Sequence, residues 1–346
     1  MPHCRLSFLV YPLVEEWHAC PVCGSERMRP LHVYRSRRKL SPEPLLALLG
    51  CQACGVAHSA PTPTSEELDA YYTEPEGWES RTSESEEDIA YALEHKGARY
   101  ARQFELLRGH LDPPAAGGAP RAFDFGCGLG SWLDSLEDAG WQTYGLEPGA
   151  KQARVAARRH RMLEAVPHGG EFELAVLHHV LEHLPDPLGT VSDVARALVP
   201  GGQLFVSVPD LGRVHQHRKL GYAASDLHIV SFSLSGLRSL LGLAGLVIEE
   251  HLETAEWDAE AGATRLRVLA RKSDLARFPL EESPLEPAVA SLRELGRLES
   301  REARDETFDK ARKVSPGRAD GDRERGARSR ESPPPVATLK RLLRRR

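Results

Sequence analysis

Residues 122–133 read AFDFGCGLGSWL, and this stretch decides the fold of the central part of the chain. An apolar run predicts a strand, Gly126, Gly128 and Gly130 predict a tight turn, and the amphipathic residues that follow predict a helix. Such a unit lets a ligand approach the backbone closely, because amide groups at the helix start face it. Asp124 places a carboxylate just before the first glycine, and the spacing G-x-G-x-G is one residue shorter than the dinucleotide fingerprint.

A second carboxylate, Glu147, stands seventeen residues after Gly130, at the end of the next apolar run. A carboxylate there can accept hydrogen bonds from both hydroxyls of a ribose. A nucleoside cofactor without a pyrophosphate suits this geometry, so we expect S-adenosylmethionine (SAM), with Asp124 and the glycine loop near its amino-acid end. Cys127 lies between two of the glycines, where its small size matters more than its thiol, and we include it with the loop glycines among the cofactor-binding residues. The alternative is a plain glycine turn followed by an ordinary surface glutamate.

Short apolar runs alternate with amphipathic segments from residue 121 to residue 272. Strands are predicted over Ala122–Phe125, Gln142–Leu146, Leu174–His178, Gln203–Val208, Leu246–His251 and Arg265–Ala270. Helices are predicted near Ser131–Ala139, Ala150–Arg161, Thr190–Leu198 and Ser233–Ala244. This alternation indicates an α/β fold with a mostly parallel sheet that is covered on both faces.

Five motifs in order resemble those of class I SAM-dependent methyltransferases. FDFGCGLG and GLEPG are similar to the motifs of the first two strands, LHHVLEHLPDP (177–187) to the fourth strand, and LVPGGQLFVSVPD (198–210) to the fifth. LHIVSFSLSGLRSLLGLAGL (227–246) resembles a loop and helix of one bacterial branch, which also carries a CxxC…CxxC module ahead of the methyltransferase domain. The resemblance covers about residues 17–272 and implies a Rossmann-like seven-stranded sheet, although no third strand is predicted between Arg161 and Phe172.

Several polar residues follow the fourth predicted strand, where open α/β sheets place their ligands. The resemblance implies that this segment lies beside the cofactor, so His178 is expected to contact SAM and His179, Glu182 and His183 to belong to the catalytic site. His228, in the later loop, is the candidate on the acceptor side. Methyl transfer from a sulfonium is an in-line displacement, and histidine suits the removal of one proton from the acceptor at neutral pH. The alternative is a Glu–His pair that only hydrogen-bonds a loop.

Four cysteines form two CxxCG motifs, Cys20–Cys23 and Cys51–Cys54. A two-residue gap lets both thiolates of a pair face one point, and the glycine permits the tight turn around it. Two such pairs are typical of a closed tetrahedral zinc site, whose four protein ligands leave no position for water, so the metal is expected to be structural. The alternatives are a redox role, although a redox dithiol needs one pair only, and a fortuitous spacing of the cysteines.

Composition divides the chain into four regions. They are a zinc-ribbon-like, zinc-binding module (17–60), a helical connector over the cofactor cleft (61–111), the SAM-dependent methyltransferase domain (121–272) and a charged tail (275–346). In the connector, helices are predicted over Ser65–Tyr72, which opens with a capping signal, and roughly over Glu86–Arg108. The tail loses the hydrophobic pattern and is rich in charge and proline, which predicts disorder.

The net charge of −5 is unevenly distributed, since residues 301–346 carry +7 and residues 1–300 carry −12. An acidic body is not typical of a nucleic-acid binder, so a small-molecule acceptor is expected, such as a saccharide or another secondary metabolite. No apolar run approaches the roughly 18 residues that span a bilayer. The apolar stretch Leu6–Val14 is interrupted by Pro12 and does not predict a secretory signal. Six cysteines are too few for a disulfide scaffold, which favours the reducing cytoplasm.

Two other functions remain open. An RNA or protein methyltransferase could use the zinc module to recognise a macromolecule, and basic residues clustered on the folded domains would favour it. A non-catalytic interaction module could keep the same fold. Asp124, Gly126, Gly128 and Glu147 argue against that alternative, because a binding module needs no cofactor cleft.

Overall fold

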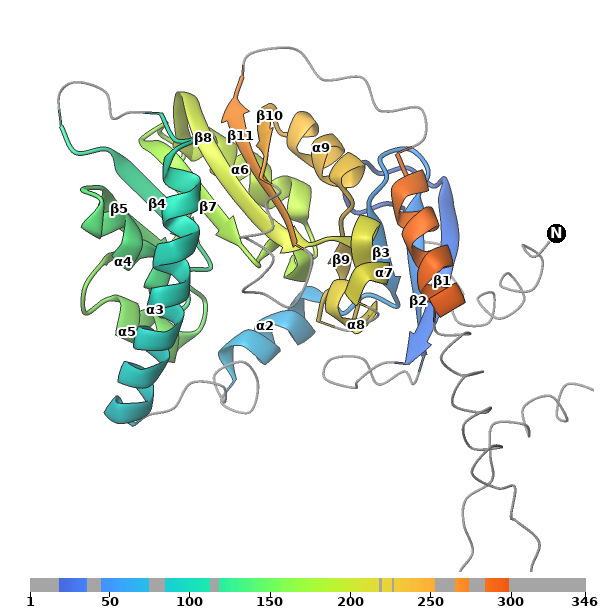
Figure 1. The fold of residues 1–346 in the computed structure, drawn as a ribbon, viewed down its shortest axis with the longest axis horizontal. Helices are drawn as coiled ribbons and strands as arrows, with labels where there is room; N and C mark the ends of the chain where they lie inside the picture. Colours follow the sequence, from blue (N-terminus) through green and yellow to red (C-terminus); the bar gives the residue numbers. More distant parts are fainter. Residues whose placement is uncertain are drawn as a thin grey trace, which may run out of the picture. The chain divides into compact units, whose positions relative to one another are not determined.

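The computed structural model describes residues 19–35, 45–74, 85–112, 118–217, 220–225, 227–252, 265–273 and 284–298 (Figure 1). The chain divides into the unit Met1–Arg301, to which all these residues belong, and the unit Glu302–Arg346. The stretch Leu6–Val14 and two parts of the predicted tail, residues 275–283 and the residues after 298, lie outside the described residues.

A mixed seven-stranded sheet with the order β10-β11-β8-β7-β4-β5-β6 forms the centre of the first unit (Figure 1). Its strands are β4 (Arg121–Phe125), β5 (Gln142–Leu146), β6 (Arg161–Met162), β7 (Phe172–His178), β8 (Leu198–Pro209), β10 (Leu246–His251) and β11 (Arg265–Lys272). The first five of these strands are parallel, whereas β11 is antiparallel to both β8 and β10. The α/β, Rossmann-like sheet is therefore confirmed.

The third strand, β6, was not expected from the sequence. It is two residues long and pairs with β5 through Tyr144↔Arg161 and Gly145↔Met162. Two residues are too few for an alternating pattern to be visible, which is why sequence periodicity did not predict this strand.

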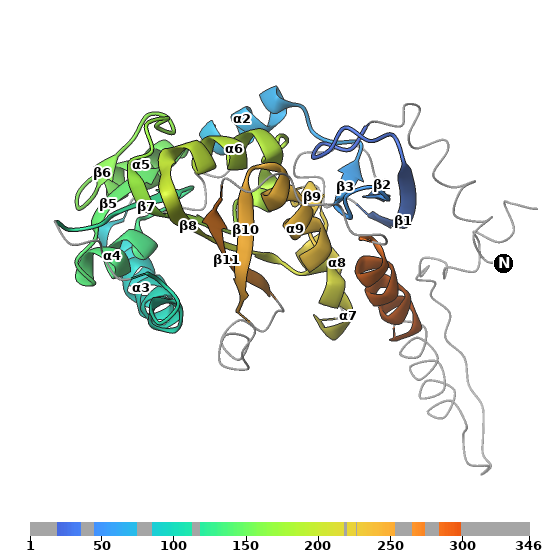
Figure 2. The ribbon, with the colours of Figure 1, turned by 90° about the horizontal axis from the view of Figure 1, so that it is seen from above.

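Helices cover both faces of the seven-stranded sheet. Each face offers them apolar side chains, because successive side chains of a strand point to opposite faces. On β4, Phe123 packs in a cluster with α6 (Pro187–Ala197) and α9 (Leu234–Leu243), whereas Ala122 packs with α3 (Glu86–Arg108) and α4 (Ser131–Asp138). Figure 2 shows α3 and α4 on the opposite side of the sheet from α6. A further helix, α5 (Ala150–Ala156), follows β5.

A second, four-stranded sheet has the order β1-β2-β3-β9 and is antiparallel throughout. Three of its strands come from the N-terminal module: β1 (Met28–Arg35), β2 (Leu45–Cys51) and β3 (Ala57–Ala60). The fourth, β9 (Val230–Ser231), comes from the segment after β8, and the amide of Ser59 also donates to the carbonyl of Ile229 at 2.9 Å. The N-terminal module therefore shares a sheet and a core with the part of the chain that builds the seven-stranded sheet.

The connector forms two helices, α2 (Ser65–Thr73) and α3. Thr64 caps α2 in a capping box, since its side chain accepts from the amide of Glu67 and the Glu67 carboxylate accepts from the amide of Thr64. Both helices begin at the residues that the sequence predicts. Shorter elements, η3 (Leu211–Arg213), α7 (Val214–His217) and α8 (Leu220–Ala223), lie between β8 and β9.

The prediction of disorder from about residue 275 is wrong for residues 284–298. Residues 286–298 form a helix, and its buried side chains join a cluster with residues of β2, η3 and α8. The buried side chains of this segment include Leu285, Ala288, Val289, Leu292 and Leu295. They recur at helical spacing, a signal that the high charge and proline content of the wider segment obscured.

Candidate functional site

The glycine loop follows β4 and needs glycine at its turns. Gly126, Gly128 and Gly130 all have positive φ, of 77°, 56° and 87°. A Cβ on Gly126 would lie 2.6 Å from Cγ2 of Val180. The loop is tied to the end of β5, because the amide of Gly126 donates to the carbonyl of Leu146 at 2.7 Å. Three turns in sequence therefore bring backbone amides to the carboxyl edge of the sheet.

Glu147, directly after β5, bridges two turns. Its Oε2 accepts from the amide of Gly128 at 2.9 Å and its Oε1 from the amide of Gly149 at 3.0 Å. Burial raises the pKa of Glu147, although these two hydrogen bonds oppose the shift. Each carboxylate oxygen keeps a lone pair for a further donor. Glu147 thus keeps acceptor capacity beside the glycine loop, and its contact with ribose hydroxyls stays a prediction.

Asp124, at the end of β4, is 2% exposed, and its Oδ1 has no hydrogen-bond partner in the described part of the chain. Burial, and then the negative charge of Glu147, raise the pKa of Asp124 to about 8. A buried carboxylate without a partner is costly, and a cationic ligand would remove that cost. The ammonium and sulfonium groups of SAM are such cations, so the residues present fit this cofactor.

A cavity of about 350 Å³ lies against the loop and Glu147. Four segments of the chain line it: α2, the end of β4, the end of β5, and the segment after β7 that carries His179 and His183. The side chains from α2 include Leu68 and Tyr72, which were not among the predicted site residues. Their helical spacing was visible in the sequence, but which way this face of α2 points depends on tertiary packing.

His179, Glu182 and His183 lie together at the end of β7, partly in the 3-10 turn η2 (Leu181–His183). His179 has φ 59°, the one positive φ of a non-glycine residue in the described ranges, and its Nδ1 hydrogen-bonds Oε1 of Glu182 at 2.9 Å. Burial lowers the pKa of His179 and lowers that of His183 to about 4. Burial opposes the charge of Glu182, but the hydrogen bond from His179 and the other nearby histidines outweigh it, so its pKa falls to about 2.

His228 joins this group from the loop before β9. Its ring lies 4.7 Å from the ring of His183, centroid to centroid, and nearly perpendicular to it. The loop is held by Ser225, whose hydroxyl oxygen accepts from the amides of Leu227 and His228 at 3.2 and 3.0 Å. The structure therefore brings together the four residues predicted to be catalytic.

His178 and Cys127 have a different setting from the other predicted site residues. The ring of His178 is buried against Tyr100 and Trp132, and its Nε2 hydrogen-bonds Oε1 of Gln103 at 3.2 Å. It does not contribute to the lining of the cavity, so its contact with SAM stays a prediction. Cys127 packs with Leu133, and burial raises the pKa of its thiol, which fits a small packing residue rather than a nucleophile.

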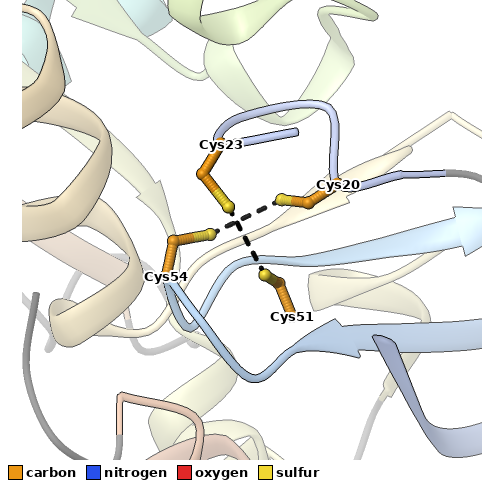
Figure 3. Close-up of side chains that lie close together, drawn as sticks. All are labelled: Cys20, Cys23, Cys51 and Cys54. Atoms are coloured by element: carbon orange, nitrogen blue, oxygen red, sulfur yellow. Dashed lines mark hydrogen bonds between the residues drawn. The ribbon is translucent and has the colours of Figure 1, made fainter. Parts of the chain in front are cut away.

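The four cysteines of the CxxCG motifs converge, as Figure 3 shows. Their sulfur atoms all lie within 4.8 Å of one another, with 3.5 Å between Cys20 and Cys54 and 3.6 Å between Cys23 and Cys51. The two turns repeat the same contacts. In each, the glycine amide donates to the carbonyl of the first cysteine at 2.9 Å, and a backbone amide points at its sulfur at 3.4 Å. Four converging thiols with these second contacts fit a tetrahedral metal site.

Comparison with protein families and curated proteins agrees with this geometry. Residues 88–251, slightly less than half of the chain, match a family model described as "Methyltransferase domain". The chain is similar to the ubiquinone biosynthesis O-methyltransferase of Aromatoleum aromaticum, with 34% identity over 110 residues, 28% of this chain and 47% of that protein. The enzyme of the same name from Nitrosospira multiformis is 31% identical over 117 residues, which are 30% of this chain and 48% of that protein. The chain thus spans about half the length of the curated relatives it matches.

Solved structures of methyltransferases also align with this chain. An S-adenosylmethionine-dependent methyltransferase from Mesorhizobium loti aligns with a TM-score of 0.39 and 19% identity, over 49% of this chain and 97% of that one. A SAM-dependent methyltransferase from Methanosarcina mazei aligns with a TM-score of 0.36 and 18% identity, over 45% of this chain and 94% of that one. No helix in the described ranges has the length and apolar character needed to cross a bilayer. Residues 88–251 are thus similar to a methyltransferase domain, and they contribute six of the seven strands of the Rossmann-like sheet.

Proposed function

We propose that this protein is a SAM-dependent methyltransferase that transfers a methyl group in line to a small-molecule acceptor. The observation that carries the proposal is the cavity that has Gly126 and Glu147 on one wall and His179 and His183 on another. The proposed cofactor-binding groups and the candidate acceptor-binding groups therefore face one cavity. When bound, SAM supplies a methyl group activated by a sulfonium.

The residues of the chain have separate tasks in this proposal. Glu147 accepts hydrogen bonds from the ribose hydroxyls with the lone pairs that Gly128 and Gly149 leave available. Asp124 takes the cationic amino-acid end, which supplies the positive charge that its buried carboxylate lacks. Holding donor and acceptor in line is the main contribution to the rate, since the methyl group is already activated.

The acceptor is proposed to enter beside α2. Leu68 and Tyr72 from this helix and Leu184 after β7 give the cavity apolar walls against which the acceptor can pack. His179 and His228 are the candidates for orienting the acceptor or removing its proton, and Nε2 of His179 has no hydrogen-bond partner in the described part of the chain. A small acceptor is supported by the curated relatives, which are named as methyltransferases of ubiquinone biosynthesis. A saccharide or another secondary metabolite stays the sequence-based prediction.

We also propose that Cys20, Cys23, Cys51 and Cys54 hold one structural zinc ion. The converging thiols and the repeated turns support it. Because four protein ligands leave no open position, this ion would stabilise the fold and take no part in methyl transfer. Thiolate ligands need a reducing compartment, which agrees with the predicted cytoplasmic location.

Calorimetric titration of the full chain with SAM tests the proposed function. Glu147→Ala removes a charge-assisted acceptor, and we expect a loss of about 1.5–3 kcal/mol, or about 10- to 150-fold in affinity. Glu164→Ala is the matched control, because Glu164 is exposed and does not line the cavity. Failure of the wild type to bind SAM, or equal affinity in the wild type and Glu147→Ala, would contradict the proposal.

A further inference from the structure

Glu182, His183 and His228 form a second cluster of metal-ligating groups, separate from the four cysteines. One carboxylate oxygen and one nitrogen from each ring all lie within 4.8 Å of one another. The three residues come from two places in the chain, the turn η2 after β7 and the loop before β9. A single ion with bonds of about 2.0–2.2 Å can span such a set after small side-chain rotations.

Glu182 is built into this cluster with one oxygen left over. Its side chain is 1% exposed, and Oε1 hydrogen-bonds Nδ1 of His179 at 2.9 Å. Oε2 is buried and has no hydrogen-bond partner in the part of the chain that the structure describes. Because buried polar atoms in native proteins are almost always satisfied, this oxygen indicates a ligand that supplies positive charge or a donor.

His183 has one ring nitrogen left for a ligand. Its Nδ1 lies 2.9 Å from the carbonyl oxygen of Leu227, and a carbonyl only accepts, so Nδ1 carries the hydrogen. The lone pair of the neutral ring is then on Nε2, the arrangement in which a backbone carbonyl orients a metal-binding histidine. Leu227 directly precedes His228, so one loop both orients the first histidine and supplies the second.

The cluster also lies where an acceptor would be. His183 lines the cavity, and Tyr72 of α2 packs edge-on against its ring, with the centroids 6.3 Å apart. Two histidines and one carboxylate are three protein ligands, a number typical of metal sites that keep an open position for a substrate or water.

We propose that Glu182, His183 and His228 bind one divalent transition-metal ion, with an open coordination position that faces the cavity. His179 acts as a positioning residue through its hydrogen bond to Glu182. This part of the inference is independent of the methyltransferase activity.

The role of the ion in the reaction rests on the proposed function. The ion would bind a hydroxyl oxygen of the acceptor and lower the pKa of that hydroxyl, so its proton leaves to water. The oxygen then forms a bond to the methyl carbon, the bond from that carbon to sulfur breaks, and its electron pair stays on the sulfur. The substrate class is therefore an acceptor hydroxyl rather than a carbon or an amine.

Cobalt titration of the full chain loaded with a single equivalent of zinc tests the site, because the four thiols take up that equivalent and leave the second cluster without metal. Cobalt bound by nitrogen and oxygen shows weak visible bands, whereas cobalt bound by thiolates adds an intense charge-transfer band. We expect the wild type to take up one equivalent of Co²⁺ without the thiolate band. Both His228→Ala and Glu182→Gln should weaken this uptake by at least about 100-fold.

His168→Ala is the matched control, because His168 is exposed and lies outside the cluster, and it should take up cobalt like the wild type. SAM affinity, measured on every variant, reports whether the cofactor site is still folded. His228→Asn serves as a second variant if Glu182→Gln does not fold. The proposal is overturned if the wild type takes up no cobalt without thiolate bands, or if His228→Ala takes up as much as the wild type.

The same experiment separates this inference from the proposed function. Cobalt uptake by a wild type that does not bind SAM would support the metal site and refute the methyltransferase assignment. SAM binding without cobalt uptake would support the proposed function and refute the metal site. His228 would then remain a candidate base or acceptor-orienting residue.

Discussion

The Cys4 cluster and the cleft at the carboxyl edge of the seven-stranded sheet differ in what they leave unsatisfied. In the first, four sulfur atoms converge on one point and the surrounding amides point at two of them. In the second, buried oxygens of Asp124 and Glu182 have no hydrogen-bond partner in the described ranges. A closed set of ligands is typical of a structural site, whereas unpartnered buried groups mark a place that awaits a ligand.

Removing one thiol from the closed site should have the largest effect. Cys51→Ser should abolish binding of the thiolate-bound metal and destabilise the four-stranded sheet, because metal binding in such modules contributes on the order of 10 kcal/mol to folding. Metal analysis and thermal unfolding of the purified chain would measure this. Cys127→Ala should keep the metal, since Cys127 is not one of the four converging thiols. A wild type that is fully folded but contains no metal would show that the Cys4 cluster is not a structural metal site.

The open site should be unstable until it is filled, and Asp124 makes this testable by pH. Its pKa is raised to about 8 in the folded protein, above the ordinary 3.8. Because the folded protein holds this proton more tightly than the unfolded chain, protonated Asp124 contributes to the free energy of unfolding. This contribution is complete below the pKa of the unfolded chain and is lost as the pH rises through about 8. The loss is on the order of 1.4 kcal/mol for each pKa unit.

Denaturant unfolding at several pH values between 4 and 9 measures the effect of Asp124. Asp124→Asn should gain stability relative to the wild type as the pH rises. SAM should stabilise the wild type more at pH 9 than at pH 6, because its cations pair with the ionised carboxylate. Parallel pH profiles for the wild type and Asp124→Asn would show that Asp124 is not the group that titrates.

Two glycines, one in the glycine loop and one within α3, differ in whether the backbone requires glycine. Gly126 has φ 77° and no room for a Cβ beside Val180, so Gly126→Ala should cost about 1–3 kcal/mol and weaken SAM binding. Gly97 lies within α3, and a Cβ there would meet nothing within 4 Å. Gly97→Ala should therefore stabilise the protein by about 0.5–1 kcal/mol.

Chemical denaturation and SAM titration of these two variants would measure both effects. Opposite signs are expected, since one glycine is required by the ligand-binding turn and the other is only tolerated in a helix. Equal small effects at both positions would mean that the loop can relax, and that its shape is not what prepares the cofactor site.

Local patterns in the sequence were sufficient for much of the fold. The predicted and observed bounds coincide for α3 at Glu86–Arg108 and for the strands Gln142–Leu146 and Leu246–His251. The glycine loop, Glu147 and the paired cysteines were predicted too, because a positive φ, a strand end and a CxxC turn are properties of a few neighbouring residues. In such cases the information is contained in the local sequence, and packing only confirms it.

Contacts between distant residues were decided by tertiary structure. The strand Val230–Ser231 is too short to show a period, and it exists because β3 offers it an edge. The helix over 286–298 is stable because its apolar face is buried against β2 and α8, which its charged composition does not show.

The same reason applies to the site. The sequence by itself determined that the chain carries a glycine-rich turn after a strand, a carboxylate at the end of the next strand and two CxxCG pairs. Only the tertiary structure decided that His228 would meet Glu182 and His183 beside the cavity, because residues more than forty positions apart meet only when the whole sheet has formed. Chain connectivity sets which groups are available, and the free energy of packing sets which of them come together.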